Sequence, residues 1–323
     1  MHTKALEEFA GKMNSLAQEE IPFFFMVDYE CERPILIPLE ELEERGILTN
    51  LNPSSSDQES KHNIEISAQV EAYSSYNKKF EKVLEQIKFG NSYLCNLTSA
   101  TPITLSHELI DIYYNVQSKY KILYQDQFLC FSPETFVQIK DGIISSYPMK
   151  GTMDASIKNA EEELLKSKKE KAEHNTIVDL IRNDLSMISS QVEVKRFRYI
   201  DRIQSNGQEL LQTSSEICGQ LPKNYREKIG SILCSLLPAG SISGAPKRKT
   251  LEIIEEVEAY KRAYYTGVAG VFQNGILDSC VLIRFIEKNR DSYYYKSGGG
   301  ITKFSDAQSE YNELKQKIYV PTL

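Results

Sequence analysis

The sequence lacks the features that mark nucleic-acid-binding, zinc-binding and membrane proteins. Its 323 residues carry a formal net charge of -7, so nothing basic enough for a nucleic-acid surface is present. The four histidines are scattered and show no zinc-ligand spacing. The longest apolar run, residues 23–27, is far too short to span a bilayer. We therefore expect no nucleic-acid partner, no zinc and no membrane association.

Paired cysteines and a secretory signal are also missing. None of the six cysteines belongs to a CxxC pair. Residues 1–20 are typical of a polar amphipathic helix rather than of a signal peptide. Both observations predict a cytoplasmic protein with reduced thiols.

The composition is that of an ordinary soluble globular protein, with 41% hydrophobic and 26% charged residues. We find no internal repeat and no low-complexity segment, and residues 50–61 are the clearest loop. Length alone suggests about two domains. Because no linker must separate two of them, we expect one large domain over residues 1–323.

Hydrophobic periodicity and turn residues predict the secondary structure. Strands are expected at residues 22–29, 92–100, 128–131, 135–140, 143–148, 265–273, 276–287 and 292–297. Helices are expected at residues 1–20, 66–89, 155–183, 249–260 and 305–318. Long helices between runs of strands joined by hairpins favour an α+β fold over a βαβ repeat.

Lys150 is the most informative residue of the chain. It lies in the sequence Tyr-Pro-Met-Lys-Gly-Thr of residues 147–152, between an apolar strand and a Gly-Thr turn. Backbone on both sides restrains such a lysine, and a partly desolvated amine loses its proton more easily and becomes a nucleophile. The alternative is an ordinary surface lysine at a strand end.

A carboxyl group is predicted close to this lysine. The dipeptide Asp-Gly at residues 141–142, between two apolar runs, is a strong signal for a two-residue hairpin. If the residues that flank the turn pair with each other, Glu134 comes opposite Met149 and is a diagonal neighbour of Lys150. The hairpin then holds an acid beside a nucleophile. A surface ion pair of little energetic value is the alternative.

Two predicted helices carry carboxylates at helical spacing. Glu170 and Glu173 are three residues apart, and Glu310, Glu313 and Lys317 share a face at i, i+3 and i+7. One carboxylate from each helix could clamp Mg²⁺, a hard ion that prefers oxygen ligands and keeps several waters. Solvated charge is the alternative explanation of both patterns.

Groups suited to bind anions occur at further places. The Gly/Ser-rich loop 240–247 precedes a predicted helix, and its N–H groups and serine hydroxyls can hold a carboxylate. Residues 297–300, Ser-Gly-Gly-Gly, let a ligand approach the backbone closely. Arg284, inside an apolar strand, needs an anionic partner if it points inward. Tyr265 is a candidate hydroxyl donor near it, with simple packing as the alternative.

Together these segments resemble the chorismate-utilising enzymes. The matching motifs occur in the family's order over residues 85–318: 132–134 (Ser-Pro-Glu), 148–152 (Pro-Met-Lys-Gly-Thr), 170–174 (Glu-Lys-Ala-Glu-His), 179–184 (Asp-Leu-Ile-Arg-Asn-Asp), 240–247, 265–267 (Tyr-Thr-Gly), 283–284 (Ile-Arg), 298–300 and 310–317. The resemblance implies an anthranilate-synthase-like α+β sandwich of antiparallel sheets packed face to face, with helices outside. Residues 1–84 resemble a shortened N-terminal portion.

The resemblance also implies a role for each matched residue. Glu173 and Glu313 would bind Mg²⁺, supported by Glu170 and Glu310 directly or through metal-bound water, and the metal would bind the ring carboxylate of chorismate. The groups implied to bind the substrate are Arg284, Tyr265 and the backbone of Gly298, Gly299 and Gly300, at the enolpyruvyl carboxylate, together with Ser241, Thr152 and Lys317.

Within this family, Lys150 resembles the nucleophilic lysine of the aminodeoxychorismate synthases, where anthranilate synthases usually have alanine. In the implied reaction, the lysine attacks ring carbon C2 while the C4 hydroxyl leaves, protonated by Glu134 as general acid. Ammonia then attacks C4 and expels the lysine. The implied product is 4-amino-4-deoxychorismate, a precursor of p-aminobenzoate and folate.

Two positions depart from the family pattern. Leu94 stands where isochorismate and salicylate synthases carry a lysine base, and leucine takes up no proton, which argues against both activities. Gln212 stands where the family commonly has a histidine linked with pyruvate release. The absence of that histidine suits an enzyme that keeps the enolpyruvyl group.

The chain also lacks the Gly-x-Cys-x-Gly turn of a glutamine amidotransferase. Ammonia is therefore expected from solution or from a separate amidotransferase subunit in a heterodimer. Two other functions stay open: an anthranilate synthase component I that releases pyruvate, and a non-catalytic regulatory subunit. An inert subunit has no need for all five of Glu134, Lys150, Glu173, Glu313 and Arg284.

Overall fold

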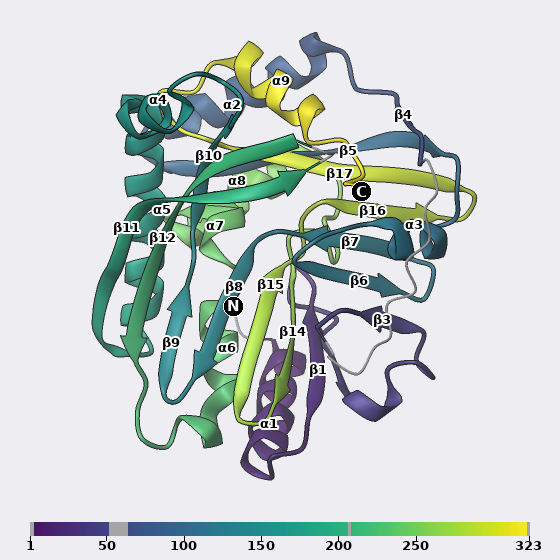
Figure 1. The fold of residues 1–323 in the computed structure, drawn as a ribbon, viewed down its shortest axis with the longest axis vertical. Coiled ribbons are helices and arrows are strands. Elements are labelled where there is room, and N and C mark those ends of the chain that lie inside the picture. Colours follow the sequence, from purple (N-terminus) through teal and green to yellow (C-terminus); the bar gives the residue numbers. More distant parts are fainter. Residues whose placement is uncertain (1–2, 52–63, 206–207, 322–323) are drawn as a thin grey trace. The chain divides into compact units, whose positions relative to one another are not determined.

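The computed structural model describes residues 3–51, 64–205 and 208–321. They form two compact units, each built on one sheet: unit 1 comprises residues 1–42, 134–241 and 266–281, and unit 2 comprises residues 43–133, 242–265 and 282–323. Both units combine helices with antiparallel strands (Figure 1), which confirms the α+β class. One domain with face-to-face sheets stays a prediction, and most of the predicted loop 50–61 lies outside the described residues.

Unit 1 carries the sheet that contains Lys150. The strand order is β10-β12-β9-β8-β15-β14-β1-β2, in which β10 and β9 pair with different stretches of β12, residues 210–214 and 217–220. Strand β11 pairs with β12 along residues 208–220. Every residue of β1 is buried, so both faces of the sheet are covered at this strand. The strands are β1 (Phe23–Val27), β2 (Ile35–Pro38), β8 (Thr135–Lys140), β9 (Ile143–Ser146), β10 (Met149–Asp154), β11 (Ser190–Ser205), β12 (Gln208–Gln220), β14 (Val268–Gln273) and β15 (Ile276–Val281).

The helices of unit 1 are anchored by short polar contacts. Thr3 caps the first helix, accepting a hydrogen bond of 3.2 Å from the Leu6 N–H. This helix packs against α6, where a Cβ added to Gly230 would lie 2.3 Å from the Ala10 carbonyl oxygen, so only glycine fits. The helices are α1 (Lys4–Gln18), α4 (Ala160–Lys166), α5 (Lys168–Ser186) and α6 (Ile229–Leu236), with the short 3₁₀ turns η1 (Leu39–Glu41) and η2 (Tyr225–Lys228).

Two predictions for unit 1 are wrong in part. The single helix expected over residues 155–183 is two helices, because the chain breaks at Ser167, whose hydroxyl accepts a hydrogen bond of 3.3 Å from the Glu170 N–H and starts α5. The long strands β11 and β12 were not predicted. In β11, Gln191 and Arg198 have positive φ and the pairing register shifts three times, which removes the alternation that predicts a strand.

Unit 2 is built on the sheet β13-β5-β17-β16-β7-β6-β3, with β4 paired to β5. Its strands are β3 (Ile47–Thr49), β4 (Ile66–Ala68), β5 (Leu94–Leu105), β6 (Tyr120–Tyr124), β7 (Phe128–Ser132), β13 (Gly244–Ala245), β16 (Phe285–Asn289) and β17 (Ser292–Ile301). Its helices are α2 (Tyr73–Lys88), α3 (Leu109–Asn115), α8 (Lys247–Glu258) and α9 (Ala307–Gln316). The one-turn α7 (Gly240–Ser243) contains the boundary between the units.

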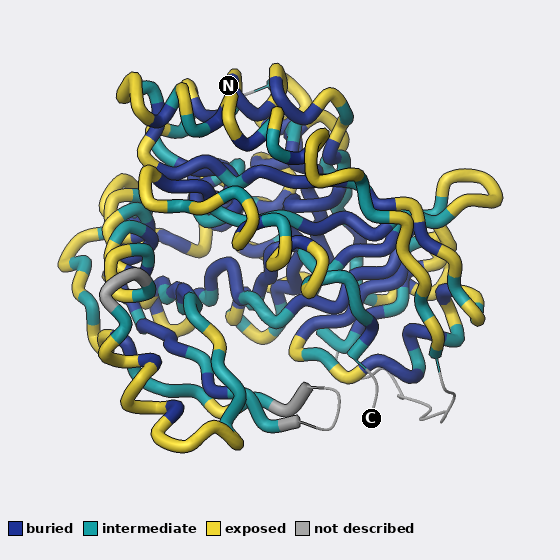
Figure 2. The backbone as a smooth tube through the Cα atoms, turned by 90° about the horizontal axis from the view of Figure 1, so that it is seen from above, coloured by how far each residue is buried: buried dark blue, intermediate teal, exposed yellow. Residues whose placement is uncertain are grey.

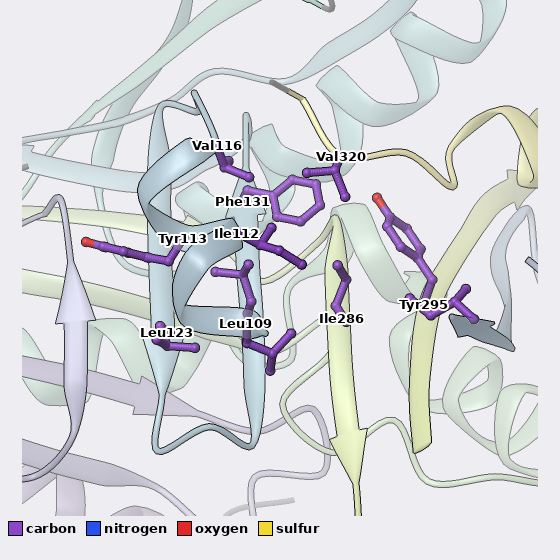
Figure 3. Packing of buried hydrophobic residues seen from close by; sticks show 11 residues of the cluster. Leu109, Ile112, Tyr113, Val116, Leu123, Phe131, Ile286, Tyr295 and Val320 are labelled. Atoms are coloured by element: carbon purple, nitrogen blue, oxygen red, sulfur yellow. The ribbon is translucent and has the colours of Figure 1, made fainter. Parts of the chain in front are cut away.

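Apolar side chains from α3, β7, β16 and β17 form a core in unit 2. Leu109 and Ile112 of α3 are fully buried against Phe131, Ile286 and Tyr295 of the sheet (Figure 3). In each unit the strands contain the most deeply buried stretches, while exposed residues gather on helices and turns (Figure 2).

Two further predictions also need correction. The helix expected over residues 66–89 begins only at Tyr73, since residues 66–68 form β4. The strand expected over residues 276–287 is two strands in different sheets, β15 and β16. Between them Arg284 has a φ of 54°, which an extended strand does not allow.

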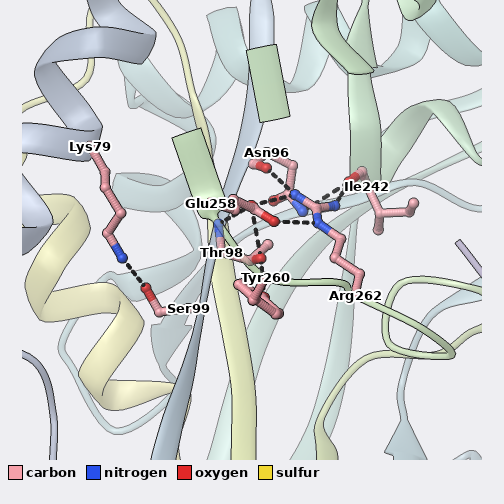
Figure 4. Close-up of polar contacts among 8 residues, drawn as sticks. All are labelled: Lys79, Asn96, Thr98, Ser99, Ile242, Glu258, Tyr260 and Arg262. Atoms are coloured by element: carbon pink, nitrogen blue, oxygen red, sulfur yellow. Dashed lines mark hydrogen bonds and ion pairs between the residues drawn. The ribbon is translucent and has the colours of Figure 1, made fainter. Parts of the chain in front are cut away.

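A buried ion pair fixes α8 to β5 in unit 2. Arg262 donates to the Glu258 carboxylate at 2.6 and 2.8 Å, and both side chains are almost fully buried. The same carboxylate accepts from the Thr98 N–H at 2.7 Å, and Arg262 also donates to the carbonyl oxygens of Asn96 and Ile242 (Figure 4). Figure 4 also shows the Lys79 amine donating to the Ser99 hydroxyl at 3.0 Å. Such a network satisfies every charge that it buries.

Candidate functional site

Lys150 lies in β10, where the strand is interrupted by a bulge. Its backbone pairs with Thr213 of β12, and the register shifts between Lys150 and Thr152. Gly151 has a φ of +75°, and a Cβ added there would lie 2.7 Å from Glu170 Oε2. The turn therefore requires glycine and brings the α5 carboxylate next to the backbone beside the lysine. Lys150 itself is half-buried, and Thr152 is exposed.

The predicted hairpin exists, but its register does not extend to Glu134. Lys140 pairs with Ile143 as expected, and the recorded pairing runs only to Gln138 and Ser145. After β9 ends at Ser146, the chain pairs with β12 instead of β8. The prediction that Glu134 lies opposite Met149 is therefore wrong. Pro148 has no N–H group with which to continue the ladder.

Glu134 has a different partner in unit 1. Its Oε1 accepts a hydrogen bond of 3.0 Å from the Ser241 hydroxyl, and its carbonyl oxygen accepts one of 3.1 Å from the Val281 N–H. The carboxyl is half-buried at the start of β8. Two residues that the sequence assigned to the site separately, a candidate acid and a candidate substrate contact, are thus brought together.

His174 is a further candidate residue, to which the sequence analysis assigned no role. Its ring is fully buried, and its Nε2 lies 2.6 Å from the Ser215 hydroxyl, which accepts a hydrogen bond from the Arg198 N–H. Burial, then the charges of Arg198 and Lys150, lower the pKa of His174 to about 4. Its Nδ1 has no hydrogen-bond partner in the described part of the chain. The sequence does contain an indication of this residue, because His174 directly follows the two glutamates in the motif 170–174.

The two carboxylates of α5 lie one turn apart. Glu170 is in the first turn, where its N–H group is capped by Ser167, and its carboxylate lies beside Gly151. Glu173 is half-buried on the same helix. Of these two carboxylates, the structure places that of Glu170 beside the strand that carries Lys150.

In unit 2, three charged groups of the α9 region converge on the glycines of β17. Lys317 Nζ donates to the Gly298 carbonyl oxygen at 2.6 Å and lies 2.7 Å from Glu313 Oε1. A Cβ added to Gly299 would lie 3.3 Å from Glu310 Oε2, 3.7 Å from Glu313 Oε1 and 3.8 Å from Lys317 Nζ. The prediction that Glu310, Glu313 and Lys317 share one helical face is confirmed, and their charged groups lie close to the backbone of Gly299.

Tyr265 is buried and Arg284 is half-buried in unit 2. Arg284 Nε lies 3.5 Å from the Tyr319 hydroxyl, and no carboxylate partner of this arginine is recorded among the described residues. Burial acts to lower the pKa of Arg284, but the hydroxyls of Tyr319 and Tyr295 outweigh it and the pKa is raised. The guanidinium is thus a permanent cation. Burial raises the pKa of the Tyr265 phenol, which stays a hydrogen-bond donor.

Part of the Gly/Ser-rich loop 240–247 is paired in a sheet and is therefore not open to bind an anion. Gly244 and Ala245 form β13, paired with Cys95 and Leu94 of β5. A Cβ added to Gly244 would lie 1.9 Å from the Leu94 carbonyl oxygen, so this glycine serves close strand packing. The prediction of free N–H groups is wrong for this part of the loop. Leu94 itself is buried.

The carboxylate pairs suit a hard divalent cation. Glu310 and Glu313 approach one point above Gly299, and Glu170 and Glu173 share a helix. Mg²⁺ is commonly held by one or two carboxylates with water and ligand oxygens completing its shell. In the described ranges, no set of three or more His, Cys, Asp or Glu side chains is arranged to hold a metal. Magnesium therefore stays a prediction.

Comparison with known proteins decides the family. Residues 16–322 match the family described as chorismate binding enzyme. The chain belongs to the chorismate binding enzymes. Among its relatives, a Haemophilus influenzae protein named as uncharacterized and PabA-like is 46% identical over 323 residues, which cover 99% of this chain and 98% of the relative.

Two further members with named activities are similar to this chain. Aminodeoxychorismate synthase component 1 of Bacillus subtilis is 31% identical over 259 residues, 76% of this chain and 54% of that protein. The crystal structure of anthranilate synthase component I from Streptococcus pneumoniae superposes with a TM-score of 0.67 at 27% identity, over 90% of this chain and 70% of that chain. Chorismate-binding members with different products thus share this fold.

No helix in the described portion of the chain combines the length and the hydropathy needed to cross a bilayer.

Proposed function

We propose that this chorismate binding enzyme is an aminodeoxychorismate synthase component I, which converts chorismate and ammonia to 4-amino-4-deoxychorismate. The observation that carries the proposal is Lys150, a half-buried amine on a glycine-interrupted strand whose bulge contacts the α5 carboxylate Glu170. The similarity to the Bacillus subtilis aminodeoxychorismate synthase supports it.

The groups of unit 1 supply the chemistry in this proposal. The neutral Lys150 amine bonds to ring carbon C2, and the C4–O bond breaks as Glu134 donates its proton, so that the hydroxyl leaves as water. Ammonia then bonds to C4, and the Lys150 nitrogen leaves C2. Two covalent steps replace one difficult substitution. The Ser241 hydroxyl holds the Glu134 carboxyl in place by its 3.0 Å hydrogen bond.

The groups of unit 2 hold the substrate in this proposal. Arg284, with no carboxylate partner recorded among the described residues, is the cation for the enolpyruvyl carboxylate, and Tyr265 donates a hydrogen bond. The Gly298–Gly300 backbone would let the substrate approach closely, because glycine carries no side chain. Glu173 and Glu313 would hold Mg²⁺, with Glu170 and Glu310 as supports. When bound, the ion would neutralise the ring carboxylate of chorismate.

Ammonia reaches the enzyme from solution or from a glutamine amidotransferase subunit in a cytoplasmic heterodimer. The sequence contains no Gly-x-Cys-x-Gly turn with which to hydrolyse glutamine itself. Turnover of glutamine by this chain alone would contradict this part of the proposal.

The second candidate is anthranilate synthase component I. The similarity to the Streptococcus pneumoniae anthranilate synthase favours it. It would release pyruvate, whereas an aminodeoxychorismate synthase keeps the enolpyruvyl group. A non-catalytic regulatory subunit is the candidate of another class, and it would consume no chorismate.

One assay separates the three functions. Purified chain is incubated with chorismate, Mg²⁺ and ammonium, and the products are resolved by mass. We expect an aminated product that retains the enolpyruvyl group, without pyruvate. Anthranilate with pyruvate would indicate the second candidate, and unchanged chorismate would indicate the third.

A further inference from the structure

Arg198 interrupts β11 of unit 1 with an unusual backbone conformation. Its φ is 46°, and the pairing register between β11 and β12 shifts between Arg196 and Tyr199. A left-handed conformation is costly for a residue with a long side chain, and it persists only where the surrounding contacts hold it. Arg198 is also buried. The contacts that hold this residue therefore indicate what the strained conformation is for.

The guanidinium of Arg198 caps the end of α4. Its Nη1 donates to the Leu165 carbonyl oxygen and its Nη2 to the Leu164 carbonyl oxygen, each at 3.0 Å. Carbonyl groups in the last turn of a helix have no N–H partner within the helix, and the helix dipole favours a positive charge there. The flat guanidinium, with its fork of donors, is suited to two neighbouring oxygens. Arg198 therefore fixes where α4 ends.

The end of α4 determines where α5 begins. A single residue, Ser167, separates the two helices, and its hydroxyl accepts a hydrogen bond of 3.3 Å from the Glu170 N–H. Glu170 lies in the first turn of α5, and its Oε2 lies 2.7 Å from the position of a Cβ added to Gly151, the residue after Lys150. A shift of this joint between the helices would therefore move the Glu170 carboxylate relative to the strand that carries Lys150.

The backbone of Arg198 holds the same region from the side of the sheet. Its N–H donates to the Ser215 hydroxyl at 2.9 Å, and that hydroxyl lies 2.6 Å from Nε2 of His174 in α5. The N–H of Ser215 donates to the Pro148 carbonyl oxygen at 3.0 Å, two residues before Lys150. Arg198 thus connects the end of α4, the helix α5 and the sheet beside Lys150.

We propose that Arg198 is a positioning residue, which holds the Glu170 carboxylate at the bulge beside Lys150. The inference rests on the proposed function, in which Lys150 is the nucleophile and Glu170 supports Mg²⁺. Arg198 touches neither the substrate nor the metal in this proposal, and it acts through the joint between α4 and α5. Its loss should therefore slow the reaction without weakening the contacts of unit 2 with the substrate.

The kinetic test uses two variants that both remove the guanidinium. At saturating Mg²⁺, Arg198→Ala and Arg198→Gly should lower kcat for amination about tenfold to a hundredfold and leave the KM for chorismate unchanged, since small misplacements near reacting groups cost rates of this order. Glycine adopts positive φ freely, so Arg198→Gly should unfold at a higher urea concentration than Arg198→Ala and yet be no more active. Arg202→Ala removes an exposed arginine of the same strand, paired with Glu209 at 3.0 Å, and as the matched control it should keep full activity.

Hydrogen exchange tests the positioning without turnover. In both Arg198 variants, the amides of residues 171–176 should exchange at least about tenfold faster than in the wild type, because the first turns of α5 lose their hold. The amides of α6, which packs against α1, should exchange at the rate of the wild type.

The outcomes separate the inference from the proposed function. Unchanged exchange in α5 of both variants overturns the inference, and so does an activity that follows stability, with kcat regained in Arg198→Gly. If the wild-type chain forms no C4-aminated product, the proposed function fails. The exchange rates then decide by themselves whether Arg198 holds α5.

Discussion

At the scale of single residues, the account depends on Lys150. Replacement by alanine removes the nucleophile, and we expect the rate of amination at C4 to fall at least a hundredfold, within the range of covalent and acid–base contributions. Lys158→Ala, at an exposed lysine that follows the same strand, is the control and should keep full activity. Formation of the aminated product is measured by mass in each case. Unchanged turnover of Lys150→Ala contradicts the covalent route.

His174 predicts a dependence of stability on pH. In the unfolded chain the imidazole takes up a proton below its ordinary value of 6.5, while in the folded chain it does so only near pH 4. The unfolded state therefore binds more protons in this interval, and stability falls as the pH falls from 6.5 to 4, by about 3 kcal/mol. The free energy of unfolding, measured by urea denaturation at a series of pH values between 4 and 6.5, should change less with pH for His174→Gln than for the wild type. Parallel curves would refute the prediction.

The sequence predicts the arrangement of site residues that are close together in the chain, but not of those that are far apart. Glu310, Glu313 and Lys317 share a helix face by spacing alone, and the structure brings them together. The partner of Glu134 was not predictable in the same way. It depends on where β9 ends and on Ser241, which is 107 residues away in sequence.

At the scale of elements, the bulge in β10 is the most sensitive point. Gly151→Ala forces an L side chain into positive φ and toward Glu170, so we expect a loss of about 1–2 kcal/mol in stability together with reduced activity. Gly90→Ala is the matched control, because Gly90 also has positive φ but nothing within 4 Å of an added Cβ. The Gly90→Ala variant should be less stable but should keep its activity. Denaturation curves and turnover measured on both variants decide the point.

The buried ion pair between Glu258 and Arg262 makes a second prediction for an element. Glu258→Leu leaves the guanidinium buried without its carboxylate and should cost about 3–5 kcal/mol of the free energy of unfolding. Glu258→Leu/Arg262→Met removes both charges and should be more stable than the single variant. The exposed pair of Asp179 and Arg182 is the comparison, where loss of the carboxylate should cost less than about 1 kcal/mol. A double variant less stable than the single one would contradict this reading.

Elements with regular periodicity were predictable, and those with interruptions were not. The hairpin over residues 135–146 follows from its Asp-Gly turn, and its pairing of Lys140 with Ile143 is confirmed. The strand β11 was not predicted, because residues in left-handed conformation and register shifts break the alternation of its side chains between the two faces of the sheet. The long helix expected over residues 155–183 continues the helical pattern across Ser167, where a side-chain cap starts a new helix instead.

At the scale of the whole molecule, the residues assigned to one reaction come from both units. Unit 1 carries Lys150, Glu134 and the α5 carboxylates, and unit 2 carries Arg284 and the α9 cluster. The order of motifs along the chain predicted the family, which the match over residues 16–322 confirms. The choice of product within the family depends on a few side chains, so it requires a chemical test.

The source of nitrogen is a prediction for the whole molecule. We expect the isolated chain to use ammonium but not glutamine, because it contains no amidotransferase nucleophile turn. Addition of a glutamine amidotransferase subunit should confer glutamine-dependent turnover and give a complex of both chains by size-exclusion chromatography. Glutamine-dependent activity of the chain alone would contradict this expectation.

The most direct measurement is the mass of the Lys150 peptide after incubation with chorismate and Mg²⁺ in the absence of ammonia. The covalent route predicts an adduct on Lys150 that equals chorismate less one water, and its disappearance when ammonium is added. An unmodified Lys150 peptide in the wild-type chain, together with a Lys150→Ala variant that aminates chorismate at C4 as fast as the wild type, would contradict the account.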